Sequence, residues 1–434
     1  MPFRRKVRKD AMKQPISAVV IEIYDDVRNA ARPQPNAPML QNNNITRASC
    51  RRLATSKRNS TIGEMKKNTT LIADRHLQEE PALQRVSRQS LGIRGGRLGL
   101  SALFSVICLG CVPRQEDEVV VYCSTDREYA APILDAFERI DGGTKVASQF
   151  DVESSKTLGL VTRIMQERER VRCDLFWSGE VMHTIRLQRA GLLKRRNWHL
   201  PAEWPSRYAA RDGSWVGLGA RARVLLVNRE KLIDPSAWPK SIAELGDTKW
   251  KNQCGLAKPL YGTSTTHFAV LAYQGLRPSF TADGFDGWMV KVKENAIILS
   301  GNKQVAQAIA SGELAWGLTD TDDAEIEIAN GHPVVVVMPD QSDESAGVLL
   351  IPGTVAVLQN APHPIAAAAL ADYLASQKTE QRLTLGNAAQ FALWPGSDDS
   401  IAKVSERVKP MQVDFEKAAD GWDELFKKLQ AVFK

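Results

Sequence analysis

The sequence predicts an α/β protein of two lobes, each a doubly wound sheet, with a ligand cleft between the lobes. Three observations support this prediction. Strand and helix patterns alternate from about residue 118 onward, the 323 residues after Cys111 suffice for two α/β lobes, and common catalytic signatures are missing. No GxxxxGK(S/T), HExxH or GxSxG motif occurs, and the six histidines are scattered. This combination favours a binding protein that closes on its ligand.

The first half of this region reads as three strand–helix pairs. Apolar runs at 119–122 and 173–177 are typical of parallel strands buried on both faces. The other elements expected here are a strand over 145–150 and helices over 130–140, 158–170 and 180–190. The β-α-β-α-β-α order indicates a doubly wound sheet with right-handed crossovers.

The second half continues the alternation, with longer loops. The strands expected are 223–228, 314–318, 334–338, 348–351 and 354–358. The helices expected are 264–273, 303–309, 364–376 and a final amphipathic helix that ends at Lys434. We expect residues 117–205 and 345–392 to form one lobe, and residues 206–344 and 393–434 to form the other.

The N-terminal stretch differs from the rest in composition. Residues 1–100 carry 20 Lys and Arg against 8 Asp and Glu, whereas the remaining 334 residues carry 37 against 42. The basic charge therefore belongs to the leader, and nucleic-acid binding by the globular part is disfavoured. All ten Trp lie after Cys111. We interpret residues 1–93 as a basic, low-order leader, either unusually long or the product of a mis-assigned translation start.

Residues 94–111 have the pattern of a signal peptide. Arg94 and Arg97 precede a short apolar run, far below the ~20 residues that span a bilayer. Gly110 before Cys111 also fits a lipoprotein signal, which would make Cys111 a lipid anchor to the membrane, although the two positions before Gly110 depart from that pattern. A buried core helix is the alternative. We predict an exported protein, periplasmic or membrane-anchored facing the periplasm.

Polar residues follow two of the predicted strands. Ser124, Thr125 and Asp126 come directly after the first strand, and Ser178 and Glu180 come after the third. Ligands of open α/β sheets bind beyond the carboxyl ends of the strands, so these five residues are candidate ligand contacts. Helix capping would account for the same residue types.

The start of the helix expected over 264–273 offers a second candidate site. Tyr261, Thr263 and Ser264 lie in a segment rich in hydroxyl groups, and a helix needs only one N-cap. Backbone N–H groups at a helix start bind anions readily. The segment therefore favours an anion site.

A third candidate site is acidic. Asp320, Asp322 and Asp323 fall within four positions after the strand expected over 314–318. One aspartate would satisfy a helix start, but three crowded carboxylates repel one another unless a cation or solvent compensates. Their oxygens suit a hard cation or an ammonium group. Asp322 and Asp323 are candidate metal ligands, with ordinary helix-start acids as the alternative.

Several stretches occur in the same order as in one known family: Val121–Asp126, Cys173–Trp177, Ala190–Leu193, Ala220–Val224, Gly301–Asn302, Ser311–Glu313, Gly317–Leu318 and Pro362–Pro364. On these stretches the chain resembles the family 1 extracellular solute-binding proteins of bacterial ABC importers, in particular the ferric-iron-binding branch. The resemblance implies a periplasmic-binding-protein-like fold, with two lobes joined by crossing strands. It also implies an ABC permease and its ATPase as partners, and no enzymatic activity.

The resemblance implies ferric iron as the transported ligand, held with a bound anion. The family's anion-holding positions match Thr263, Ser264, Asn302 and Asp320 in this sequence. No cofactor is implied, because iron would be the cargo. We expect the protein to act as a monomer.

This sequence departs from the family at the metal site. Ferric binders of the family typically carry two adjacent tyrosines where Asp322 and Asp323 stand, and the first loop has Asp126 instead of a histidine. Iron would then be held by carboxylates, with help from Tyr122 or Tyr261. The alternative ligand is an aminophosphonate or another phosphorylated small molecule, with its ammonium group against the aspartates. A secreted enzyme is disfavoured, because no nucleophile–base pair can be assembled.

Overall fold

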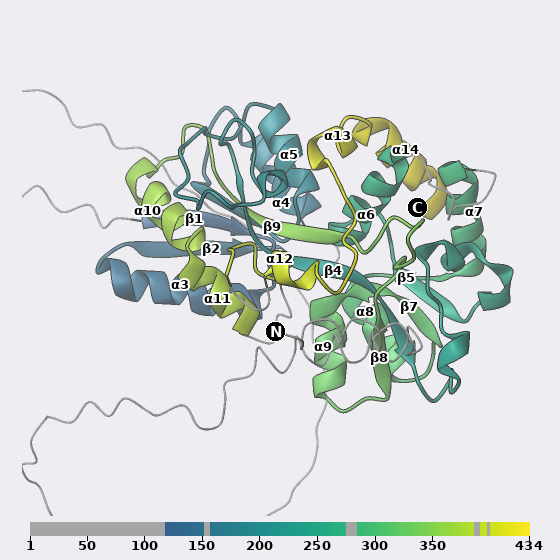
Figure 1. The fold of residues 1–434 in the computed structure, drawn as a ribbon. Helices are drawn as coiled ribbons and strands as arrows, with labels where there is room; N and C mark the ends of the chain where they lie inside the picture. The colour runs from purple at the N-terminus through teal and green to yellow at the C-terminus, as the bar shows by residue number, and fades with distance from the viewer. Residues whose placement is uncertain (1–117, 152–156, 275–283, 386–390, 397–399) are drawn as a thin grey trace, which may run out of the picture. The chain divides into compact units, whose positions relative to one another are not determined.

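The computed structural model describes residues 118–151, 157–274, 284–385, 391–396 and 400–434 (Figure 1). The predicted leader and signal peptide lie outside these residues. Among the described helices, none combines the length and the apolar character needed to cross a membrane.

The first lobe is built on a sheet in the order β2-β1-β3-β9-β4. Strand β1 (Glu118–Cys123) pairs in parallel with β2 (Lys145–Phe150) and with β3 (Leu175–Ser178). Strand β9 (Leu350–Val357) then pairs antiparallel with β3 and with the first part of β4 (Val216–Asn228). The apolar residues of β1 and β3 are mostly buried, as expected from the apolar runs that predicted parallel strands.

The second lobe shares strand β4 with the first. From Arg223 onward β4 pairs antiparallel with β7 (Trp316–Asp320) on one side and β8 (Val334–Val337) on the other. Strand β5 (Cys254–Ala257) continues the sheet in parallel with β7 and with β6 (Ile297–Leu299). Each lobe is thus a mixed sheet, and β4 passes from one to the other, as the two-lobed prediction requires.

Several predicted strand boundaries differ from the structure. The strand expected over 314–318 is β7, which ends at Asp320, and the strand expected over 173–177 is β3, which begins at Leu175. Strand β4 begins at Val216 rather than at residue 223, because residues 216–222 are also buried and pair with β9. Strand β9 is continuous where two strands were expected, since Pro352 and Gly353 lie within the antiparallel ladder to β4.

Helices cover both faces of the first sheet. Helix α3 (Arg127–Asp141) buries Ile133, Leu134 and Phe137 at helical spacing and ends at Gly142, whose φ of 74° is the left-handed cap that glycine favours. It shares an apolar cluster with α10 (Pro364–Leu374). The other helices of this lobe are α4 (Leu158–Gln166), α5 (Met182–Arg189) and α11 (Gln377–Leu385).

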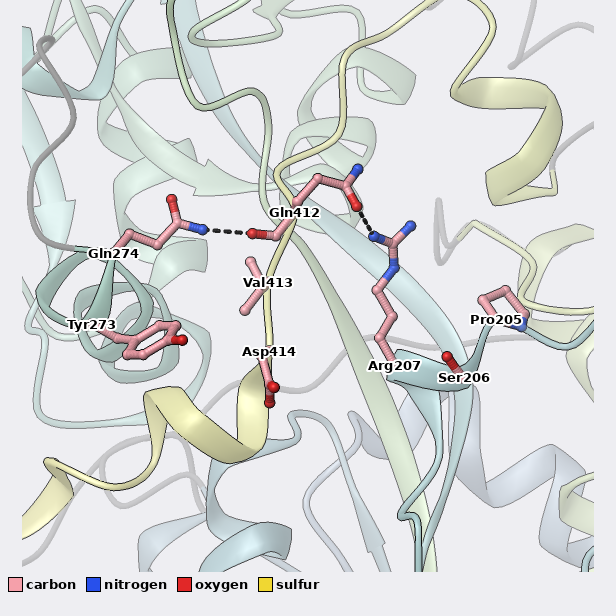
Figure 2. A pocket seen from close by; sticks show the side chains of 8 residues that line it. All are labelled: Pro205, Ser206, Arg207, Tyr273, Gln274, Gln412, Val413 and Asp414. Carbon is pink, nitrogen blue, oxygen red and sulfur yellow. Dashed lines mark hydrogen bonds between the residues drawn. The ribbon is translucent and has the colours of Figure 1, made fainter.

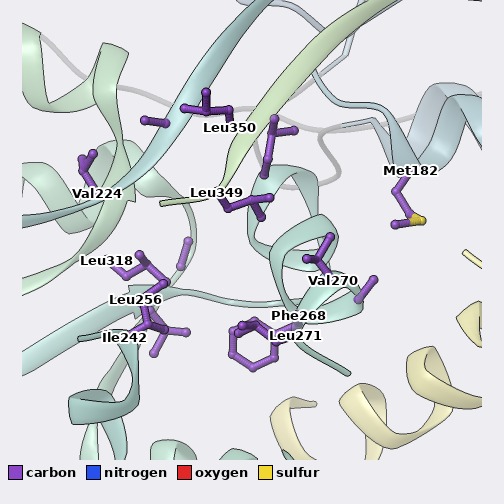
Figure 3. Packing of buried hydrophobic residues seen from close by; sticks show 14 of the residues in the cluster. Met182, Val224, Ile242, Leu256, Phe268, Val270, Leu271, Leu318, Leu349 and Leu350 are labelled. Atoms are coloured by element: carbon purple, nitrogen blue, oxygen red, sulfur yellow. The ribbon is translucent and has the colours of Figure 1, made fainter. Parts of the chain in front are cut away.

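The second lobe contains α6 (Gly262–Tyr273), α7 (Gly284–Asn295), α8 (Asn302–Ala310) and α9 (Thr321–Ala329). The C-terminal segment adds α12 (Ile401–Val404), α13 (Phe415–Ala418) and α14 (Trp422–Phe433). Figure 3 shows part of the apolar core on which these helices pack. Within it the ring of Phe268 contacts Trp288 and Phe433 at centroid distances of 5.4 and 5.9 Å, which ties α6 to α7 and α14.

Candidate ligand-binding site

Two arginines of β4 lie at the junction of the lobes. Side chains alternate along a strand, so Arg221 and Arg223 point to the same face. They are 7% and 0% exposed, and a buried guanidinium requires carboxylates or other acceptors around it. Their partners therefore define the site.

Arg223 is surrounded by residues from three elements of the second lobe. It donates to Asp320 Oδ1 at 2.5 Å, to Asn302 Oδ1 at 3.1 Å and to Ser264 Oγ at 3.1 Å. A longer bond of 3.3 Å reaches Thr263 Oγ1. The four residues predicted to hold an anion are thus brought together around one buried arginine.

Asp320 is held as a carboxylate. Its Oδ2 accepts hydrogen bonds from Thr263 Oγ1 at 2.6 Å and Asn302 Nδ2 at 3.0 Å. Burial opposes ionisation, but Arg223 and Arg221 outweigh it and hold the pKa of Asp320 below its usual value.

Three helices of the second lobe begin at this place. The N-cap residues of α6, α8 and α9 are Tyr261, Gly301 and Asp320, and none of them caps its helix with a side-chain hydrogen bond. The first backbone N–H groups of a helix lack partners within the helix, and they favour anions. All three N-cap residues line one cavity.

The cavity lies between segments of both lobes. Its first-lobe wall contains Ser124, Gly179 and Glu180, and Arg221 lies at the junction; the second-lobe wall contains Lys258, Tyr261, Thr263, Asn302 and Asp320. The cavity has a volume of about 20 Å³, counted as the space that the centre of a water molecule can occupy. In this conformation it has room for about one water molecule. A larger solute would require the lobes to separate.

Arg221 connects the two walls. Its guanidinium donates to Asp322 Oδ2 at 2.9 Å and to the carbonyl oxygen of Gly179 at 2.7 Å, and Asp320 Oδ2 lies 3.7 Å away. Burial works against the charge of Arg221, but Asp322, Asp320 and Asp126 together raise its pKa above the usual range. Asp126, at the start of α3, thus acts on the site through its charge.

Asp320, Asp322 and Asp323 form an acidic cluster. One carboxylate oxygen from each lies within 4.8 Å of the others, close enough to hold one cation. Tyr129 lies on the first turn of α3; burial, and next the charge of Asp322, raise the pKa of its phenol above the usual value. The charge of the cluster in the second lobe thus acts on a tyrosine of the first lobe.

The polar residues of the first lobe mainly hold its loops together. Ser124 Oγ accepts from Gly179 N at 3.0 Å and from Thr157 Oγ1 at 3.1 Å, while Ser178 is buried beside it at 3.4 Å. Thr125 and Ser178 are outside the set that lines the cavity. Ser124 and Thr157 are the residues of this group that line it.

Glu180, predicted as a ligand contact, lines the cavity and also holds a helix start. Its carboxylate accepts from the backbone N–H groups of Met182 and His183, at 2.6 and 3.0 Å, and from the hydroxyl of Thr266 on α6. It caps α5 and links the lobes. Burial opposes its charge, but His183 and these hydrogen bonds hold the pKa of Glu180 below the usual value.

The sequence prediction missed Arg221, Arg223, Lys258 and Tyr129. The two arginines carried a signal, because they stand two positions apart in a run of apolar and small residues. Tyr122, expected to assist iron binding, instead donates to Glu167 Oε2 at 3.0 Å and lies outside the cavity-lining set.

A larger groove elsewhere contains none of the predicted site residues (Figure 2). Across it, Gln412 accepts from Arg207 through its side chain at 2.5 Å and from Gln274 through its backbone oxygen at 2.8 Å. No buried charge lines this groove, which has a volume of about 710 Å³. The buried charges at β4 instead mark the candidate site.

Two α/β lobes that share a crossing strand, with a polar cavity where they meet, define a solute-binding protein. The chain belongs to the bacterial extracellular solute-binding proteins, whose family model matches residues 119–384. The family establishes an exported protein that binds a solute.

Relatives agree with this assignment along most of the chain. The Fe(3+)-binding periplasmic protein of Serratia marcescens is 22% identical over 307 residues, which are 70% of this chain and 87% of the relative. The structure of iron-bound HitA from Pseudomonas aeruginosa matches with a TM-score of 0.61 at 22% identity, covering 73% of this chain and 99% of that one. The Trichodesmium protein IdiA (FutA) with iron and citrate ligands matches with a TM-score of 0.59 at 21% identity, covering 73% and 100%.

Proposed function

We propose that this protein is the solute-binding component of an ABC importer that captures ferric iron together with a small oxyanion. The observation that carries the proposal is the cluster of Asp320, Asp322 and Asp323, whose oxygens lie within 4.8 Å of one another beside Arg221 and the starts of α6 and α8. Carboxylate oxygens suit a hard cation, and the arginine and helix starts suit its anion. The iron-binding relatives support the same ligand.

The charges explain why an anion should accompany the iron. Asp322 and Asp320 lie 2.9 and 3.7 Å from Arg221, and Asp320 also pairs with Arg223. A trivalent cation on these carboxylates would meet two nearby guanidinium groups, which repel it. An oxyanion against Arg221 removes much of that repulsion, and citrate accompanies iron in one structural relative.

We assign the iron to Asp322 and Asp323, with the phenol of Tyr129 as a further oxygen donor from the first lobe. The anion would lie against Arg221 and the helix start at Thr263. Binding from both lobes would favour the closed form, which would deliver the ligand to a membrane permease driven by its ATPase.

A second candidate ligand is an aminophosphonate or another phosphorylated molecule. The specific observation in its favour is that Arg221 and Arg223 already neutralise Asp322 and Asp320. The pocket would then act first as an anion site, and the ammonium group would meet Asp323.

Calorimetric titration distinguishes the two. The proposal expects ferric citrate to bind, and ferric iron alone to bind at least tenfold more weakly. Binding of 2-aminoethylphosphonate with no response to either iron form would replace the proposed ligand by the second candidate.

A further inference from the structure

A buried carboxylate outside the cavity holds the crossing strand just before the arginines. Glu380, on α11, is 1% exposed. Its Oε1 accepts from the backbone N–H groups of Gly219 and Leu393, both at 2.8 Å, and its Oε2 accepts from Trp394 N at 2.7 Å. Backbone N–H bonds to a buried carboxylate are among the stronger hydrogen bonds in proteins.

Gly219 marks an irregularity in β4. The pairing with β9 shifts register between Leu218 and Ala220, and Gly219 has a φ of 61°, in the left-handed region. Its N–H donates to Glu380. Because a bulge changes the direction of the side chains that follow, its geometry fixes where Arg221, two residues later, points.

The same carboxylate fixes a second connection between the lobes. Residues 391–394 pair with β4 through Phe391 and Ala220, which exchange hydrogen bonds of 2.8 and 2.6 Å. The chain then continues to α13 and α14, which contact α6 of the second lobe. Through these hydrogen bonds Glu380 holds β4 next to residues 393–394, where the C-terminal segment begins its path to the second lobe. Figure 1 shows α11 and β4 in this region.

We propose that Glu380 is a positioning residue that sets the direction of Arg221 and the resting angle between the lobes. It does so through the backbone of two interlobe connections, without touching the ligand. The inference goes beyond the proposed function, because it holds for any solute that binds against Arg221.

Asp174 provides a matched control within one lobe. It is 0% exposed and also accepts from backbone N–H groups, from Val120 at 2.7 Å and from His363 at 2.6 Å. These bonds link parts of the first lobe. Replacing Asp174 should lower stability without changing the lobe angle.

The test compares Glu380→Gln with Asp174→Asn in the full chain. Spin labels at the exposed positions 135 on α3 and 294 on α7 report the distance between lobes. Cys50, Cys108 and Cys111 are replaced by serine. The buried thiols Cys123, Cys173 and Cys254 stay, because burial raises their pKa and keeps them unreactive.

We expect Glu380→Gln to shift or broaden the distance distribution of the unliganded protein and to weaken ferric citrate binding at least tenfold. Asp174→Asn should lower the melting temperature with unchanged distances and affinity. A folded Glu380→Gln protein with wild-type distances, or an equal change in both variants, would overturn the inference. If the wild type does not bind ferric citrate, the proposed function is wrong. The distances between the spin labels in the unliganded proteins still test the role of Glu380 in that case.

Should Glu380→Gln fail to fold, Gly219→Ala perturbs the same bulge and leaves the carboxylate in place. An alanine is strained at a φ of 61°, so the bulge must shift. We expect altered lobe distances in this variant as well. Wild-type distances in a folded Gly219→Ala protein would contradict the proposal.

Discussion

Arg221 Nη1 lies 2.9 Å from Asp322 Oδ2, and both side chains are almost fully buried where the lobes meet. Asp322 was predicted as a metal ligand, and the structure places it in an ion pair with a residue that the prediction did not include. Any ligand of Asp322 must therefore also satisfy Arg221. This pair makes an accompanying anion part of the proposed binding event.

The two candidate metal ligands should respond differently to truncation. Asp323→Ala removes a half-buried carboxylate and should weaken ferric citrate binding at least tenfold, with little change in the free energy of unfolding. Asp322→Ala should also destabilise the protein by about 3–5 kcal/mol, because Arg221 would lose a buried partner. Calorimetry and urea unfolding measure the two effects. Unchanged affinity in both variants would reduce these residues to helix-start acids.

Arg223 should matter for stability as well as for binding. Arg223→Met leaves the 1%-exposed carboxylate of Asp320 without its 2.5 Å partner, which we expect to cost about 3–5 kcal/mol of unfolding free energy. Arg189→Ala is the control, because its pair with Asp420 is exposed and should contribute about 0–1 kcal/mol. If both variants lost the same free energy of unfolding in urea, burial would not determine how much the Arg223–Asp320 pair stabilises the protein.

Stability should fall below neutral pH because of His267. This residue is fully buried behind Arg223, whose Nε donates to His267 Nδ1 at 3.4 Å. Burial and then the charge of Arg223 hold the pKa of His267 well below its usual value. The unfolded chain takes up a proton below about pH 6.5 while the native protein does not, so stability falls by up to about 1.4 kcal/mol per pH unit.

His267→Gln tests this pH dependence. Urea unfolding between pH 7.5 and 5.5 should give a smaller slope for the variant, while the difference between the proteins stays constant above about pH 7. Parallel curves across the whole range would mean that His267 does not contribute.

Tyr129 should be visible in the spectrum of the iron-loaded protein. If its phenol binds iron next to Asp322 and Asp323, the loaded protein should absorb visible light, and Tyr129→Phe should abolish the band and weaken iron binding about tenfold. Tyr122→Phe is the matched control, because the hydroxyl of Tyr122 is already bonded to Glu167. Loss of the band in the control alone would assign the phenolate to Tyr122.

The sequence was sufficient to predict the strand–helix alternation and to select four residues that the structure brings together at the candidate anion site. Thr263 and Ser264 stood out because one helix start carries more hydroxyls than a cap requires, and Asn302 and Asp320 entered through the family resemblance. All four meet around Arg223. Thr263 and Ser264 are buried, but a local pattern could still single them out, because a helix start needs only one capping hydroxyl.

Local patterns could place the two arginines in an apolar strand, but they could not identify the partners of these arginines, and they gave no sign of Tyr129. The role of a charged residue in a buried strand depends on its partners, and these can lie far away in the sequence. Arg223 and Asp320 are 97 positions apart, and Arg221 and Asp322 are 101 positions apart. The predicted break in β9 failed for a similar reason, because pairing with β4 outweighs the local preference of Pro352 and Gly353 for a turn.

A thermal-shift comparison of the purified protein tests the central claim most directly. Ferric iron would be supplied alone, as citrate and with phosphate, beside 2-aminoethylphosphonate and a sugar phosphate. A ligand at a hundred times its Kd adds about 2.7 kcal/mol to the stability of the folded state, enough to raise the melting temperature by several degrees. The account predicts stabilisation by ferric iron with an anion and a much smaller effect of iron alone. Stabilisation by the phosphonate or the sugar phosphate, with no response to iron in any form, would contradict it.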